Sequence, residues 1–321
     1  MKSMWDKHKW PISIIGAILL LVLFFWLLPL FLNFLYEYVF CKEINNNFTV
    51  LGTIGDSYGV YNALFSLFAF IGLIYTLQSQ YNENKKNHVV EQYYKMLDYQ
   101  RELISDMVAF PVIKDKNAKP VQGRKVFVEY KIQLKYLNRA IQKINQKEDF
   151  GFTETEVADI SYAIFYYGSA GSWKSTMMKH LREYENCDKL VDAIVDALDK
   201  EKRYALYRTN QNYMSVYCRN MYNAIKLIDN ADCLSDEEKQ SYVKTLRAQL
   251  CNAELYVLFF NFISRFGRKW VESDYVNKYQ LLQNIPAGYC DGYDPKDYFP
   301  NIKFESEESV LSPFKNIVVP N

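Results

Sequence analysis

The chain has 321 residues, 23% of them charged, and a mean hydropathy of −0.23, values typical of a globular protein with one or two domains. Its charges nearly cancel, with 38 Lys and Arg against 37 Asp and Glu, so any electrostatic attraction to a partner must be local. Aromatic residues make up 17% of the chain, and this supply of large apolar groups argues against a disordered protein.

The first predicted element is a membrane anchor. Residues 11–35 carry no charge, and about 20 apolar residues are enough to cross a hydrocarbon core roughly 30 Å thick. A signal peptide also begins with positively charged residues, and Lys2, Lys7 and Lys9 precede the apolar segment here. However, the apolar region of a signal peptide is only about 7–15 residues long. We therefore expect a transmembrane helix that stays on the protein, which excludes a wholly soluble chain.

A second span is predicted at residues 58–78, which are also uncharged but less apolar. Lysines precede the first span and follow the second, as Lys85, Lys86 and Lys95, whereas Lys42 is the one lysine between the spans. The positive-inside rule then predicts that both termini are cytoplasmic. Residues 1–80 are accordingly interpreted as an N-terminal two-helix transmembrane hairpin.

One face of the second span carries small and polar side chains. They recur at spacings of three and four residues, which aligns them along a helix: Asn62, Ser66, Ala69, Gly72 and Thr76. Small residues allow helices to approach closely in lipid, so this face either packs within the hairpin or lines a water-filled path in an oligomer. Asp56, just before the span, is either an N-cap or an acidic residue that attracts ions to the mouth of such a path.

Beyond the hairpin, helical periodicity predicts an all-α cytoplasmic domain at residues 81–286. The helix of the second span is expected to continue to about residue 107. Further helices are predicted at residues 124–146, 154–167, 172–185, 188–207, 211–229, 235–266 and 270–284. Turn residues dominate beyond Pro286, which predicts an irregular C-terminal tail at residues 287–321.

The predicted helix 124–146 has one cationic face and one apolar face. Four basic residues of this helix, and a fifth just after its end, fall at successive intervals of four: Lys131, Lys135, Arg139, Lys143 and Lys147. The apolar residues fall on another side of the helical wheel: Phe127, Tyr130, Leu134, Leu137, Ile141 and Ile144. The basic face therefore either contacts an anionic partner, such as lipid headgroups or nucleic acid, or is simply solvated.

No residue is assigned to catalysis, and neither a metal nor a cofactor is expected. The six cysteines form no Cys-x-x-Cys pair and are accompanied by only three histidines, which argues against structural zinc. The sequence GSAGSWKS at residues 168–175 resembles a phosphate-binding loop, but Trp173 stands where that motif needs glycine. We therefore expect a protein without enzyme activity.

A polar seam is predicted on the helix 235–266. Arg247, Glu254 and Asn261 are spaced by seven residues among apolar neighbours, which brings them close to one face. Together with Arg219 of the preceding helix, they are interpreted as a partly buried polar seam. We interpret its charges as a structural ion pair rather than as catalytic groups.

Four segments resemble the phage abortive infection proteins of the AbiC-like family. They are GDSYGVYNALFSLFAFIGLIYTLQSQ at residues 55–80, QGRKVF at 122–127, YCRNMYNAIKLID at 217–229 and YVKTLRAQLCNAELYVLFFN at 242–261. The resemblance covers most of residues 50–285 and includes no catalytic signature. It implies a two-span protein of the bacterial inner membrane with a helical cytoplasmic domain, which acts in antiviral defence and is sometimes encoded beside a retron.

The leading hypothesis is a non-enzymatic effector that assembles into homo-oligomers and permeabilises or depolarises the membrane when phage infection triggers it. The resemblance supplies the defence role, while the spans and the polar face supply the mechanism. Nucleic acid, a phage protein, a retron or another defence component would be the trigger. The alternative is a membrane-tethered sensor or scaffold that binds nucleic acid or a phage protein and forms no pore. A third hypothesis is an enzyme whose catalytic motif is not recognisable in the sequence.

Overall fold

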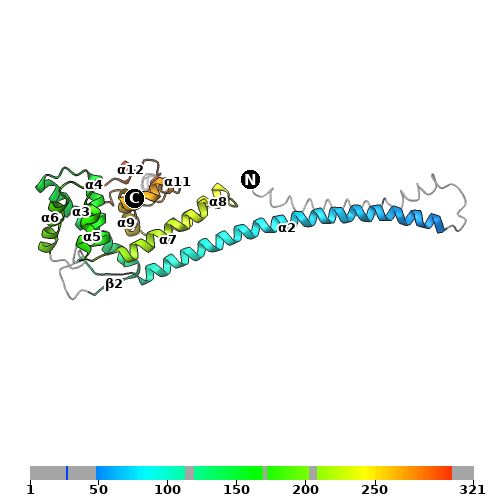
Figure 1. Ribbon diagram of the computed structural model, residues 1–321, viewed down its shortest axis with the longest axis horizontal. Helices are drawn as coiled ribbons and strands as arrows, with labels where there is room; N and C mark the ends of the chain where they lie inside the picture. Colours follow the sequence, from blue (N-terminus) through cyan, green and yellow to red (C-terminus); the bar gives the residue numbers. More distant parts are fainter. Residues whose placement is uncertain (1–26, 28–47, 113–118, 169–171, 202–207, 306–321) are drawn as a thin grey trace, which may run out of the picture. The chain divides into compact units, whose positions relative to one another are not determined.

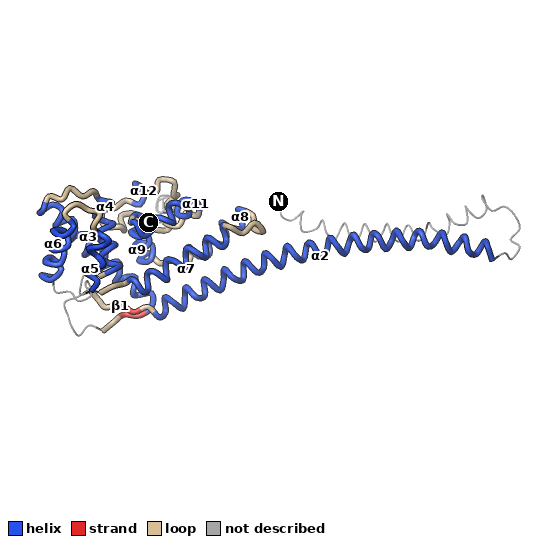
Figure 2. Tube along the Cα trace, in the orientation of Figure 1, coloured by secondary structure: helices blue, strands red, loops and turns tan. Residues whose placement is uncertain are grey.

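A computed structural model describes residues 27, 48–112, 119–168, 172–201 and 208–305 of the chain. It is 74% helix and 2% strand, as the blue tube in Figure 2 illustrates, which confirms the all-α class. The chain divides into two compact units, Met1–Leu77 and Gln78–Asn321. The first predicted span, residues 11–35, lies outside the described residues except for Leu27. The two-span hairpin therefore stays a prediction.

The helix α2 (Phe48–Asp106) is continuous and belongs to both units (Figure 1). Within the described residues, its part Asn62–Asp106 is long and apolar enough to cross a membrane, judged by length and composition alone. The side chains from residue 62 to residue 77 are all exposed. Helix α2 begins at Phe48, so Asp56 lies inside the helix, which corrects its interpretation as an N-cap.

The second unit is a bundle of short helices with one small sheet. After α2, the strand β1 (Val108–Ala109) pairs antiparallel with β2 (Val121–Gln122), and the 3-10 helix η1 (Gly123–Lys125) follows. The remaining helices are α3 (Val126–Glu148), α4 (Glu154–Tyr167), α5 (Ser172–Leu181), α6 (Cys187–Glu201), α7 (Gln211–Asp229), α8 (Asp236–Arg247), α9 (Asn252–Ile263), α10 (Arg268–Glu272), α11 (Tyr275–Lys278) and α12 (Pro295–Tyr298).

Helix α3 packs its apolar face into the core, as its periodicity predicts. Its inward side chains are 7% exposed or less: Phe127, Tyr130, Leu134, Leu137, Ile141 and Ile144. Helix α4, which packs against α3, begins at a capping box. There Glu156 N donates to Thr153 Oγ1 at 3.3 Å, and Thr153 N donates to the Glu156 carboxylate at 2.8 Å. Local sequence thus sets both the core face of α3 and the start of α4.

The helix predicted at residues 235–266 is two helices, α8 and α9. The start is as predicted, with the capping box of Ser235 and Glu238, but the backbone becomes extended at Cys251. Glu254 folds back and accepts a hydrogen bond from Cys251 N at 2.8 Å, which begins the new helix α9. Ten consecutive residues of α9 are buried, so this helix turns into the core, whereas α8 buries only two side chains.

The C-terminal part of the described chain contributes to the core without long helices. The helix predicted at residues 270–284 is interrupted at Asp274, whose φ of 55° lies in the left-handed region, and α10 and α11 are correspondingly short. Residues 287–305 have little regular structure, yet they bury several side chains: Cys290, Tyr293, Phe299, Ile302 and Phe304. The rest of the predicted tail, residues 306–321, lies outside the described residues.

Helix α7 lies against the part of α2 that belongs to the second unit (Figure 1). Gln100 Nε2 of α2 donates to Tyr217 O at 3.3 Å, and Asn220 Nδ2 donates to Met96 O at 3.0 Å and to Gln100 Oε1 at 2.7 Å. Polar side chains and main-chain carbonyls therefore fasten α7 to α2 along one side.

Candidate functional site

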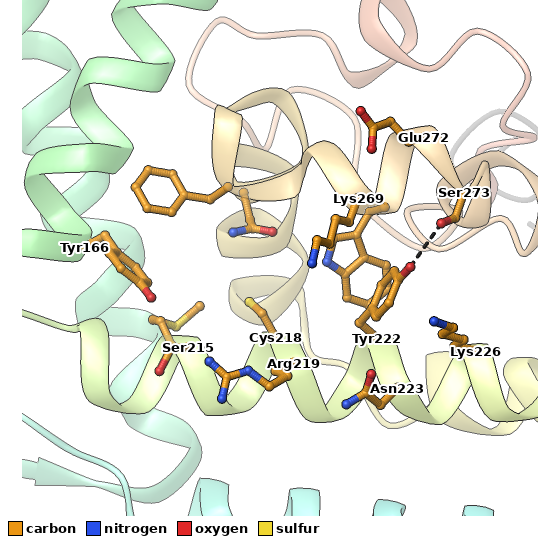
Figure 3. Close-up of a pocket in the computed structure, with 14 residues that line it drawn as sticks. Tyr166, Ser215, Cys218, Arg219, Tyr222, Asn223, Lys226, Lys269, Glu272 and Ser273 are labelled. Carbon is orange, nitrogen blue, oxygen red and sulfur yellow. Dashed lines mark hydrogen bonds between the residues drawn. The ribbon is translucent and has the colours of Figure 1, made fainter. Parts of the chain in front are cut away.

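A cleft with a volume of about 730 Å³ follows one side of α7. Figure 3 shows α7 as one wall, α10 as the opposite wall, and Tyr166 of α4 at one end. The residues that α7 contributes recur every three or four positions, because a helix returns to the same face about every 3.6 residues. They include Ser215, Arg219, Tyr222 and Lys226. The cleft is therefore built on one stripe of a helix whose residues Tyr217 and Asn220 bind α2.

Three basic side chains surround the cleft at exposed positions. Arg219 and Lys226 belong to α7, and Lys269 belongs to α10. None of the three forms a salt bridge within the described part of the chain. Glu272 also lines the cleft, but its Oε1 lies 2.6 Å from Arg268 Nε, outside the lining. The cleft thus carries excess positive charge.

An unpaired polar atom lies among the buried lining residues. The Asn261 side chain is 3% exposed, and its Nδ2 donates to Tyr162 Oη at 3.0 Å. Its Oδ1 is buried and has no hydrogen-bond partner among the described residues. Buried polar atoms in folded proteins almost always have a partner. Asn261 Oδ1 is therefore an acceptor to which a bound molecule can donate.

Aromatic rings and a thiol complete the lining. The Tyr222 hydroxyl lies 3.1 Å from Ser273 Oγ (Figure 3), and its ring meets Trp270 edge to face at 5.3 Å between centroids. Burial raises the pKa of the Cys218 thiol to about 12, so this group is protonated near neutral pH and is no activated nucleophile. Burial also raises the pKa of Tyr166, against the opposing effect of its hydrogen bond with Ser215. These neutral groups suit binding more than acid–base chemistry.

The basic face predicted on α3 divides into two parts. Lys131 Nζ lies 3.1 Å from the centroid of the Tyr289 ring, and Lys135 forms a salt bridge with Asp291. Both lysines are therefore held by the segment 287–305 of the same chain. The remaining members of the face are exposed: Arg139, Lys143 and Lys147.

These exposed basic residues border a second cleft of about 760 Å³ between α3 and α6. Helix α6 contributes acids to it as well as bases, including Asp192, Asp196 and Lys189. Glu148 carboxylate oxygens lie 2.7 Å from Lys147 Nζ and 3.1 Å from Lys189 Nζ. This mixture of charges gives the second cleft less preference for an anion than the cleft at α7 has. The described residues contain no cluster of three or more potential metal ligands.

The four residues of the predicted polar seam lie in different places. Arg247 Nη1 donates to the carbonyls of Tyr279 and Gln280, both at 3.1 Å. Glu254 is fully buried, accepts from Tyr217 Oη at 3.2 Å and lies 3.5 Å from Arg124 Nε. Because the chain breaks between α8 and α9, the spacing of seven does not align Arg247 with Glu254 and Asn261, which both lie on α9. The cleft at α7 brings together two of the four, Arg219 and Asn261.

The polar face predicted on α2 is helical and exposed. Asn62, Ser66, Gly72 and Thr76 lie on continuous helix, and Thr76 Oγ1 donates to Gly72 O at 2.9 Å. At about 100° per residue, Asp56 lies about 120° around the axis from Asn62, so it shares the helix without sharing the face.

Sequence reasoning missed most of the cleft at α7. The spacing of Ser215, Arg219, Tyr222 and Lys226 was an available signal, since it marks a polar stripe on one helix. Tyr166 and Lys269 carry no such signal, because they come from other helices and meet α7 only in the folded chain.

Residues 209–289 match the family model described as "Putative phage abortive infection protein". The match confirms the expected resemblance over this segment, which contains α7 to α11 and every lining residue of the α7 cleft except Tyr166. The resembling segments at residues 55–80 and 122–127 lie outside it. No curated protein and no solved structure matches the chain.

Proposed function

We propose that this chain, which belongs over residues 209–289 to the family of putative phage abortive infection proteins, is a membrane-anchored effector of that defence. The family name indicates a general antiviral role. The proposal adds the membrane step: on infection, the protein permeabilises or depolarises the bacterial inner membrane. It assigns no catalytic step to the chain.

The observation that carries this proposal is the exposed apolar stretch of α2. Phe68 is 67% exposed and Leu67 is 52% exposed, and every described side chain from residue 62 to residue 77 is exposed as well. Soluble monomers rarely expose such a contiguous apolar surface, whereas a helix can cross lipid because it satisfies its own backbone hydrogen bonds. The lysines that follow favour a cytoplasmic location for the second unit.

Permeabilisation is proposed to require several copies of the chain, since one pair of helices cannot enclose a path. In the assembled form, water would contact the polar face of α2, formed by Asn62, Ser66, Gly72 and Thr76. Before infection, the cytoplasmic helices would restrain α2 through its contacts with α7. A phage protein, nucleic acid, a retron or another defence component would release this restraint.

The proposal is tested by recording the membrane potential of infected cells that express the full chain. We expect depolarisation before lysis. Ser66→Leu with Gly72→Leu adds bulk to the polar face without adding charge, so this variant should insert normally yet lose both depolarisation and protection.

The matched control is Leu67→Ala with Ile71→Ala, which changes two exposed positions on the side of α2 opposite the polar face. This control should depolarise the membrane like the parent. An unchanged potential in cells that are nevertheless protected would contradict the membrane step.

The second candidate function is a membrane-tethered sensor that binds nucleic acid and forms no pore. The exposed residues Arg139, Lys143 and Lys147 favour it. Changing all three to Glu should abolish nucleic-acid binding, and binding by the parent should weaken with added salt. Lys125, Lys244 and Lys303 are exposed on other elements, so their change to Glu is a control of equal charge. Equal binding by both triple variants would contradict this function.

A further inference from the structure

We propose that the cleft along α7 binds a nucleotide, with its phosphate between Arg219, Lys226 and Lys269 and its base or sugar against Asn261. Binding to the isolated protein does not depend on the membrane step proposed above. Three features of the cleft support this assignment: its charge, its buried acceptor and its size.

The charge of the cleft fits a phosphate group. Arg219, Lys226 and Lys269 have no salt-bridge partner among the described residues, and Glu272, the acidic residue in the lining, is paired with Arg268. Figure 3 shows Arg219 and Lys226 on α7 and Lys269 on the opposite wall, so cations approach the cleft from both sides. Arginine and lysine form charge-assisted hydrogen bonds with phosphate oxygens.

The buried acceptor favours a ligand that carries hydrogen-bond donors besides its phosphate. Asn261 Oδ1 has no donor among the described residues, and the base and sugar of a nucleotide offer several. The exocyclic amine of a base or a ribose hydroxyl provides such a donor. One molecule that meets both requirements therefore combines a phosphate with a group that donates hydrogen bonds.

The size and walls of the cleft fit the rest of a nucleotide. The volume of about 730 Å³ lies in the range of roughly 300–1,000 Å³ that is common for small-molecule sites. Tyr166, Tyr222 and Phe266 are partly exposed and present aromatic carbon to the interior. Aromatic rings stack on bases with little dependence on base identity. The cleft therefore selects for the class of ligand more than for a particular base.

Titration calorimetry on the full chain in detergent tests this inference. The probes are AMP, ADP, GMP, CMP and UMP, with adenosine, inorganic phosphate and a single-stranded ten-nucleotide DNA as comparisons. We expect at least one mononucleotide to bind more tightly than both adenosine and inorganic phosphate. Its affinity should fall with added salt, since phosphate contacts carry it.

The decisive variant changes Arg219, Lys226 and Lys269 to Ala, three exposed positions whose loss should leave the fold intact. We expect nucleotide affinity to fall at least tenfold. Changing Lys125, Lys244 and Lys303 to Ala removes as many exposed cations elsewhere and should leave affinity unchanged.

Three results would overturn the assignment: no mononucleotide bound at millimolar concentration, equal affinity of the cleft variant and the parent, or inorganic phosphate bound as tightly as the nucleotides. Binding of the DNA alone would also overturn it, because no mononucleotide would then occupy the cleft. Nucleotide binding by a protein that never depolarises cells would leave this inference intact and would contradict the proposed function instead.

Discussion

Glu254 shows how one buried charge joins several elements. Its fully buried carboxylate accepts from Cys251 N at 2.8 Å and from Tyr217 Oη at 3.2 Å, and lies 3.5 Å from Arg124 Nε. It therefore begins α9 and fixes α9 to α7. Burial raises the pKa of Tyr217 well above its usual value, so this phenol remains a donor.

Removing the Tyr217 hydroxyl and removing the Glu254 carboxylate should lower the free energy of unfolding by different amounts. Tyr217→Phe deletes one donor while Glu254 keeps the others, so we expect a loss of about 1 kcal/mol in the free energy of unfolding. Glu254→Ala leaves the Tyr217 hydroxyl and Cys251 N without their acceptor, which should cost about 3 kcal/mol. Urea denaturation of both variants measures these losses. Equal costs would mean that the carboxylate is not the shared partner.

Asp229 predicts how stability depends on pH. Burial opposes its ionisation, but hydrogen bonds from Lys278 and Tyr279 outweigh that effect and hold the pKa of its carboxyl below the ordinary value. A lowered pKa in the folded state stabilises the protein above the unfolded pKa, near 4, and this contribution disappears as the pH falls through the folded pKa.

Asp229→Asn should therefore destabilise the protein by about 1 kcal/mol at pH 7 and by progressively less below about pH 4. Thermal denaturation at a series of pH values measures the difference in Tm between the two proteins. A difference that stays constant down to pH 3 would show that the carboxylate charge contributes nothing to stability.

The sequence could predict residues whose environment is local, and not those with distant partners. The inward residues of α3 follow from periodicity alone, and all six are buried. The same periodicity assigns Lys131 and Lys135 to one continuous basic face. Their partners Tyr289 and Asp291 lie more than a hundred positions further along the chain, so no spacing within α3 reveals them.

At the scale of elements, the turn from α9 into α10 depends on a close backbone approach. A Cβ on Gly267 would lie 2.3 Å from Asn261 O and 2.5 Å from Phe262 Cα. Both are main-chain atoms, which cannot move aside as a flexible side chain can. The 3-10 helix η3 (Arg265–Gly267) therefore requires glycine at its last position.

Gly267→Ala should lower the free energy of unfolding by about 3 kcal/mol, since it overpacks a rigid contact. The displaced backbone belongs to Asn261, so nucleotide affinity should fall as well. Chemical denaturation and calorimetry measure the two effects. The control is Gly292→Ala, where a Cβ meets no atom within 4 Å and only the positive φ of 101° adds strain. It should leave nucleotide affinity unchanged. An unaltered Gly267→Ala protein would contradict the tight approach.

The division between α8 and α9 illustrates which element boundaries the sequence conceals. Ser235 and Glu238 announce the start of α8 because they form a common capping box. Cys251 is an unusual residue at a helix start, and α9, with ten of its 12 residues buried, has no exposed polar face to mark a change of direction. Periodicity therefore continues through the break, and only tertiary packing separates the helices.

At the scale of the whole molecule, the sequence predicts the helical class and misses the cleft. Helical class follows from propensity and periodicity, which are properties of short segments. The cleft combines Tyr166 of α4, the polar stripe of α7, Asn261 of α9 and Lys269 of α10, so it exists only once four helices have packed. Asn261 was identified from the sequence as part of a seam, whereas the structure assigns it to the cleft.

Helix α2 has no break between Phe48 and Asp106. The polar residues at 62–76 and the residues that bind α7, near Gln100, lie on one uninterrupted helix. We predict that function depends on the angle, about the helix axis, between these two sets of residues. Inserting two alanines after Asn82 rotates the polar residues relative to the α7-binding residues by about 200° around the helix axis. Inserting seven alanines rotates them by only about 20° but lengthens the helix by about 10 Å.

If function depends on this angle, two inserted alanines should abolish protection against phage and seven should preserve it, although seven is the larger insertion. Plating efficiency of phage on cells with equal amounts of each variant gives the answer. Loss of protection by both insertions would indicate that the length of α2 matters. Protection by both would indicate that the angle between the two sets of residues has no role. Protection by the longer insertion alone would mean that the angle between the two ends of α2 carries the signal.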